Sequence, residues 1–121
     1  MQSHQILSHV VPNKVSLTTN QVTRTVTSNK PSLKVIWNAP SSGPPITSYK
    51  IWYTSGTSRS WTGRTSNGNT RMVTLENLQL GTMYQVRVRA VSDVGNGAWS
   101  DVVSKTTFNG KLMLCRIYTD F

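Results

Sequence analysis

The chain has 121 residues, with 13 Lys and Arg against 4 Asp and Glu, so its formal net charge is +9. This length fits one domain with short tails, and the excess of positive charge favours an anionic partner such as a sulfated glycan, a nucleic acid or an acidic protein surface. The single Cys115 excludes an internal disulfide, the scattered His4 and His9 offer no metal cluster with it, and no apolar run approaches the ~18 residues of a membrane span.

The chain begins with residues 1–11, which have no clear apolar period and are interpreted as a linker. They contain neither a basic start nor the apolar run of a secretory signal. The segment Pro12–Leu17 could form the first edge strand, with proline at its entrance. An alternative first strand is Val22–Val26, and the sequence does not decide between them.

The next two strands are clearer. Leu33, Val35 and Trp37 alternate with polar residues, which predicts a strand with one buried face. A loop follows at 41–45, and then a third strand at 46–53 with Tyr49, Ile51 and Tyr53 facing inward.

The middle of the chain, 55–69, is rich in Ser, Gly, Thr and Asn. We interpret it as a mobile connection with Trp61 in a short strand or turn. The alternating run 70–75 then predicts another strand.

The stretch from Leu78 to Ala90 organises the rest. Val86, Val88 and Ala90 alternate with polar residues, Tyr84 opens this strand, and Gly81 provides a turn before it. This pattern predicts a tyrosine corner, in which the phenol bonds backbone at the crossing between two sheets. Residues 101–107 are predicted to form the closing strand. Asn109-Gly110 is a hairpin turn signal, and beyond it residues 111–118 could be an added strand, the start of another unit or an unrelated tail.

The run Leu78-x-x-Gly81-Thr82-x-Tyr84-x-Val86-x-Val88-x-Ala90, followed by Gly95-x-Gly97-x-Trp99-Ser100, resembles the fibronectin type III family. The resemblance covers 12–107, between the linker 1–11 and the tail 108–121, and departs from the family at Leu80, where proline is usual. It implies an all-β fold, an immunoglobulin-like seven-stranded antiparallel β-sandwich used for protein recognition or spacing, with no reaction and no cofactor. It places Trp37 and Trp61 at tryptophans that the family carries on its second and fourth strands. The expected structural core is Trp37, Tyr49, Ile51, Leu78, Tyr84, Val86 and Val88.

One candidate site is the outward face of the third and sixth strands, with Lys50, Trp52, Arg87 and Arg89. These residues could form a cation–π stack that shields the sheet, and Trp99-Ser100 is similar to the motif with which cytokine receptors build an arginine–tryptophan ladder. The same strip could instead bind a sulfated glycan or an acidic partner.

A second candidate site is a rim of two loops at one end of the sandwich. No Arg-Gly-Asp occurs, which disfavours integrin binding by that tripeptide. Nucleic acid is also disfavoured, although Arg59, Arg64 and Arg71 lie around Trp61. The candidate loop residues are Ser42, Gly43, Pro44, Gly95, Asn96 and Gly97.

The carboxylates Glu76, Asp93, Asp101 and Asp120 have no arrangement of nucleophile and orienting base around them, so we expect no enzymatic activity. The predicted function is a protein-interaction or spacer module of a cell-surface receptor or adhesion protein, extracellular as part of a longer chain. The alternatives are a heparan-sulfate-like polyanion-binding domain and an intracellular structural repeat of a muscle-type giant protein.

Overall fold

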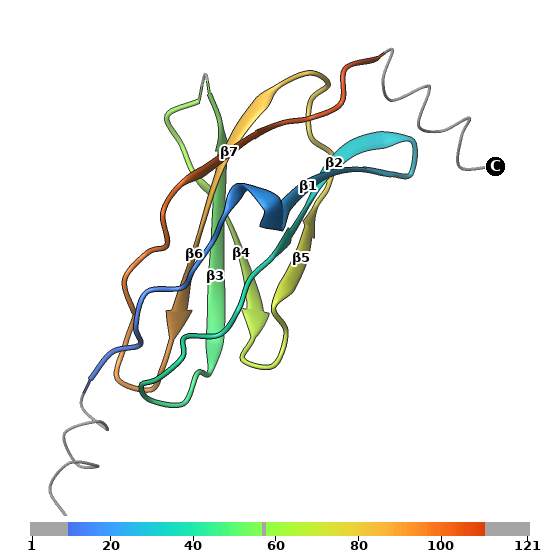
Figure 1. Ribbon diagram of the computed structural model, residues 1–121. Helices are drawn as coiled ribbons and strands as arrows, with labels where there is room; N and C mark the ends of the chain where they lie inside the picture. The colour runs from blue at the N-terminus through green and yellow to red at the C-terminus, as the bar shows by residue number, and fades with distance from the viewer. Residues whose placement is uncertain (1–9, 57, 111–121) are drawn as a thin grey trace, which may run out of the picture.

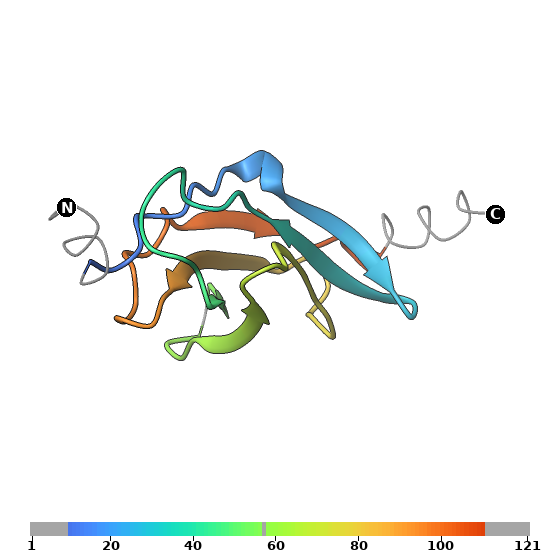
Figure 2. The ribbon, with the colours of Figure 1, turned by 90° about the horizontal axis from the view of Figure 1, so that it is seen from below.

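The computed structural model describes residues 10–56 and 58–110. Two antiparallel sheets pack face to face, with strand order β1-β2-β5 in one and β4-β3-β6-β7 in the other (Figures 1 and 2). The predicted all-β sandwich is therefore confirmed. The strands are β1 (Val22–Thr27), β2 (Lys30–Ile36), β3 (Ser48–Ser55), β4 (Thr62–Asn67), β5 (Met72–Leu75), β6 (Met83–Val91) and β7 (Val103–Thr106), and a short 3-10 helix, η1 (Thr19–Gln21), precedes β1.

The core lies between the sheets because apolar residues alternate along the strands of both. Along β6, Tyr84, Val86, Val88 and Ala90 are buried, while the residues between them are partly exposed. The indole of Trp37, just after β2, meets the ring of Tyr49 edge to face, with centroids 5.3 Å apart. All the residues expected in the structural core are buried.

The tyrosine corner is present. The backbone N–H of Gln79 donates to the hydroxyl of Tyr84 at 2.9 Å. Gly81 has φ of +52°, a left-handed conformation that glycine adopts at little cost. The Thr107 hydroxyl donates to Gln79 O at 2.6 Å, so the end of the closing strand is attached to the same corner.

Of the two candidates for the first strand, the second is observed as β1, and no strand is assigned to 12–17. Val15 and Leu17 are nevertheless fully or almost fully buried, so the entering segment contributes to the core without pairing in a sheet. Burial of these two apolar side chains explains why the segment has the alternation of a strand.

The interpretation of 55–69 as a mobile connection is corrected by β4, which pairs with β3 from Tyr53↔Thr62 to Ser48↔Asn67. Side chains along β4 are exposed or partly exposed, so they carry no apolar alternation that would mark a strand. The third strand also begins later than predicted, at Ser48 rather than Ile46.

The described chain enters at one end of the sandwich and leaves at the other (Figures 1 and 2). The predictions for residues 1–9 and 111–118 lie outside the described residues. Within 10–56 and 58–110, no helix is long and apolar enough to cross a membrane.

Candidate functional site

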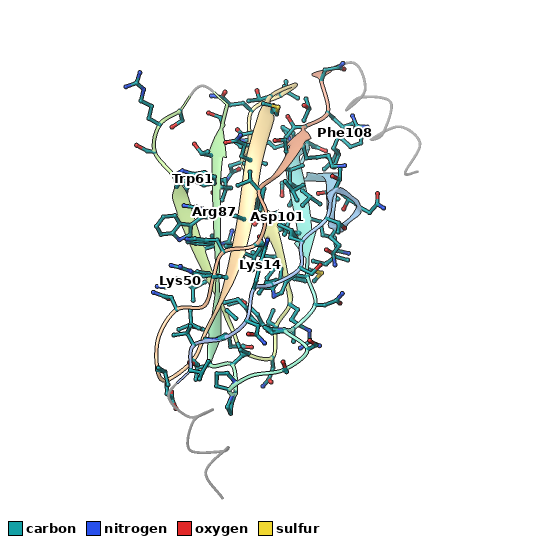
Figure 3. All side chains as sticks on the ribbon, turned by 60° about the vertical axis from the view of Figure 1, so that its left-hand side comes forward. Lys14, Lys50, Trp61, Arg87, Asp101 and Phe108 are labelled. Atoms are coloured by element: carbon teal, nitrogen blue, oxygen red, sulfur yellow. The ribbon has the colours of Figure 1, made fainter. Side chains whose placement is uncertain are left out.

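The first candidate site lies on the outer face of the four-stranded sheet. Register pairs Lys50 with Arg89 and Trp52 with Arg87 across β3 and β6. Side chains directly opposite in antiparallel strands are close neighbours on one face. The structure therefore brings all four sequence-predicted residues of this face together, and Lys50 and Arg87 lie on the same side as Trp61 (Figure 3).

Arg87 lies among three indole rings. Its guanidinium carbon is 4.3 Å from the ring centroid of Trp99, 4.6 Å from that of Trp61 and 5.6 Å from that of Trp52. Arg89 continues the stack at 4.2 Å from Trp99. We call Trp52, Trp61, Arg87, Arg89 and Trp99 the arginine–tryptophan ladder.

The Nε atoms of the two ladder arginines are engaged or covered. Arg89 Nε donates to Gly97 O at 3.0 Å. Arg87 Nε is buried and has no hydrogen-bond partner among the described residues. Burial lowers the pKa of Arg89, and the neighbouring charge of Arg87 lowers it further. The two guanidiniums are thus held for stacking, and Lys50 is the cation of this face outside the ladder.

Sequence reasoning grouped Trp52 with the two arginines but matched Trp61 only to the tryptophan that the family carries on its fourth strand. Trp61 comes from the residue just before β4, and the indole of Trp52 fits there because Gly63 has no side chain. A Cβ at Gly63 would lie 3.1 Å from Trp52 Nε1. Gly63, which stands between polar residues in the sequence, was the signal that the indole of Trp52 could lie over the backbone here.

The second candidate site is the end of the sandwich where the described chain enters, with two loops beside the entering segment (Figure 1). In the 92–97 loop, Ser92 and Gly95 exchange two backbone hydrogen bonds of 3.0 and 3.1 Å. Gly97 N donates to Ala90 O at 2.8 Å, which fastens the same loop to β6. Gly95 has φ of +149°, a conformation that favours glycine.

The 41–45 loop is fastened to the entering segment. Asn13 Nδ2 donates to both the backbone oxygen and the hydroxyl of Ser42 at 3.0 Å. Gly43 has φ of +117°. The two loops therefore have backbone and side-chain bonds that hold them in place at this end.

Apolar side chains are exposed at this end. Val10, Val11 and Val94 keep 39%, 42% and 44% of their surface exposed. A cavity of about 130 Å³ is lined by Val94 together with Pro44, Pro45, Ser92 and Asp93. We call the three valines and this cavity the loop-end surface.

The remaining arginines do not join the ladder. Arg64 Nη1 donates to Thr74 O at 3.3 Å, which connects β4 to β5 across the edges of the two sheets. The positive charge of Arg71 opposes the rise that burial causes in the pKa of Tyr49. Arg59 precedes β4 in an exposed loop.

Residues 15–106 match the family model of the fibronectin type III domain. The sortilin-related receptor of Oryctolagus cuniculus is 39% identical over 66 residues, or 54% of this chain and 3% of that receptor. The receptor of Homo sapiens is 37% identical over 68 residues, or 56% of this chain and again 3% of the receptor. The chain thus spans a small fraction of the curated relatives that it matches.

Solved structures agree with this fold. The fn3 domain of human contactin 1 has a TM-score of 0.67 at 22% identity, covering 84% of this chain and 82% of that one. Domains A168–A170 from titin give 0.65 at 25% identity, covering 82% of this chain and 33% of that one. Chicken CNTN1 FN1–FN3 gives 0.66 at 20% identity, covering 82% and 32%.

Proposed function

Because this chain belongs to the fibronectin type III domain family, we propose that it is a non-catalytic protein-interaction module that binds a protein partner through its loop-end surface. The supporting observation is the exposure of Val10, Val11 and Val94 at this end of the sandwich, together with a small cavity that Val94 lines on loops held by hydrogen bonds. Exposed apolar groups on a preorganised rim suit protein binding, since little loop ordering is needed on association.

We place the module outside the cell, in a larger receptor. Support comes from the identity of 37–39% to sortilin-related receptors over more than half of the chain. The described termini at opposite ends of the sandwich also suit a unit inserted between other domains (Figure 2). The likeness to titin domains is weaker, at 25% identity, so an intracellular structural repeat is the less favoured context.

The test is a binding screen against displayed receptor ectodomains, with Val94→Asp as the variant. A carboxylate at an apolar contact must be desolvated, so we expect a partner at the loop-end surface to bind about tenfold more weakly or worse. The exposed Val102, which lies in the segment before β7, gives the matched control Val102→Asp. Partners affected equally by the two variants, or by neither, would argue against this surface.

A second candidate function is polyanion binding on the outer face of the four-stranded sheet. The observation that favours it is charge: within the described ranges the one ion pair joins Lys14 and Asp101, at 2.6 Å, so the other cations lack acidic partners. Lys50 is free for a sulfate, whereas Arg87 and Arg89 are stacked on indoles. We therefore expect Lys50 to be the main contact of a glycan on this face.

Retention on heparin resin along a salt gradient tests this candidate. Lys50→Ala should elute at clearly lower salt than Lys34→Ala, which removes the same charge from the other sheet, where Lys34 pairs with Thr23 and Thr74. Equal elution of the two variants would mean that retention reflects net charge alone and not a site on this face.

A further inference from the structure

Strand β4 is an open sheet edge. It pairs with β3 on one side, and the strand order places no described strand on its other side. The strand contains no proline, and its side chains are exposed or partly exposed. Edge strands without proline or bulges can accept an added strand, and the one charged side chain of β4, Arg64, is held by its bond to Thr74 O of β5.

The phase of the hydrogen bonds shows which backbone groups face outward. Gly56 N donates to Met83 O at 2.9 Å, so the backbone of Gly56 is directed toward β6. Backbone groups of successive residues in a strand point to opposite sides, so the even-numbered residues of β3 face β6 and the odd-numbered Ile51 and Tyr53 face β4. Their partners Arg64 and Thr62 face back to β3. The intervening residues Gly63 and Thr65 therefore direct their N–H and C=O groups away from the sheet.

The other edges are covered. Next to β4, the outward Thr74 O of β5 accepts from Arg64, and Thr70 O accepts from the Ser66 hydroxyl at 3.0 Å. On the far side, β7 contacts β1 and η1, and Lys14 of the entering segment pairs with Asp101 just before β7. Among the described residues, the outward backbone groups of Gly63 and Thr65 in β4 have neither a covering segment nor a side-chain cap, whereas the outward oxygen of Asn67 accepts from Thr70 N and the Ser66 hydroxyl.

The charge around β4 is positive. Arg64 lies on the strand, Lys50 is opposite Thr65 on β3, and Arg59 and Arg71 lie in the connections before and after β4. None of β3, β4 and β5 contains Asp or Glu. Pairing of β4 with β4 of a second copy would bring arginines together in a chain of net charge +9, which opposes self-association.

We infer that β4 is a docking edge for an extended, acidic segment of a partner protein, which adds a fifth strand to the four-stranded sheet beside Gly63 and Thr65. Main-chain hydrogen bonds provide the affinity of such strand addition, and neighbouring side chains provide its specificity. Carboxylates on the added strand meet the cations on and around β4. This surface is separate from the loop-end surface and borders the ladder at Gly63, where the indole of Trp52 lies.

The probe is a capped seven-residue peptide of alternating valine and glutamate, titrated into the ¹⁵N-labelled chain at low salt. We expect chemical-shift changes at the amides of Gly63 and Thr65, and hydrogen exchange of these amides at least about tenfold slower at saturation. The matching valine–lysine peptide should bind about tenfold more weakly or worse. Equal binding of the two peptides, or shifts centred on residues 92–97, would overturn the inference.

Two variants complete the test. Thr65→Pro removes an outward N–H on an edge strand, where proline is tolerated, and should abolish binding. Ser104→Pro is the matched control on the opposite edge. The backbone N–H groups of Val103 and Lys105 in β7 face β6, so the N–H of Ser104 between them points outward. This variant should bind the peptide normally. Arg64→Glu keeps the backbone and should reduce the preference for the glutamate peptide, so the inference stays testable if Thr65→Pro does not fold. Concentration-dependent protection of Gly63 without peptide would instead identify a second copy as the occupant.

Discussion

Replacing Arg87 by alanine should lower the free energy of unfolding by about 2–3 kcal/mol. Each cation–π contact contributes about 0.5–2 kcal/mol depending on solvation, and Arg87 makes three, with Trp52, Trp61 and Trp99. Alanine also removes the aliphatic stem through which an arginine packs. Urea unfolding followed by tryptophan fluorescence and near-ultraviolet circular dichroism measures the change, and the dichroism also reports the order of the three indoles.

Two controls separate charge from packing. Arg87→Met removes the cation from the rings but keeps most of the stem, and it also removes the buried Nε that has no partner among the described residues. We therefore expect a loss of about 1 kcal/mol, smaller than that of Arg87→Ala, and this loss is the contribution of charge. Lys50→Ala, on the same face but outside the ladder, should change stability by less than about 0.5 kcal/mol. An Arg87→Ala protein as stable as Lys50→Ala would show that the ladder does not contribute to the stability of the fold.

Gly97→Ala should cost about 2 kcal/mol or more and disturb the loop-end surface. A Cβ at Gly97 would lie 2.5 Å from Pro12 O and 3.0 Å from Pro12 Cβ. Because the nearest atom belongs to backbone, either the entering segment or the 92–97 loop must move, and overpacking of this kind is destabilising. Urea unfolding gives the cost, and amide shifts of Val10, Val11 and Val94 show whether the two elements separate.

Gly56→Ala is the matched control. Its added Cβ would lie 3.5 Å from Met83 Cε, which is an ordinary contact with the end of a flexible side chain. Stability should stay within about 0.5 kcal/mol of the parent chain. If Gly97→Ala behaves like this control and its partner affinity is unchanged, the entering segment does not support the loop-end surface as we describe.

The sandwich itself was predictable because its strongest strands alternate in apolar character. Val86, Val88 and Ala90 of β6 and Leu33 and Val35 of β2 have the period of two that burial of one strand face requires. The tyrosine corner was predictable as well, since a tyrosine that opens a strand just after a turn glycine has a local bonding partner.

The strand β4 could not be found in this way. It lies at an edge with both faces exposed or partly exposed, so no apolar residue marks its period. Its place depends on pairing with β3, a contact between segments that the sequence does not show. The entering segment also misled the local pattern. Val15 and Leu17 are buried and alternate as in a strand, but this segment pairs with no sheet.

The sequence by itself determined which residues alternate, turn and carry charge, because these depend on the side chains of neighbouring positions. Only the tertiary structure decided that Arg87 is stacked among Trp52, Trp61 and Trp99, which come from β3, the residue before β4 and the segment before β7. It also decided that β4 is the open edge and that Pro12 lies against Gly97. Contacts between distant segments follow from how the two sheets pack, and no local pattern encodes them.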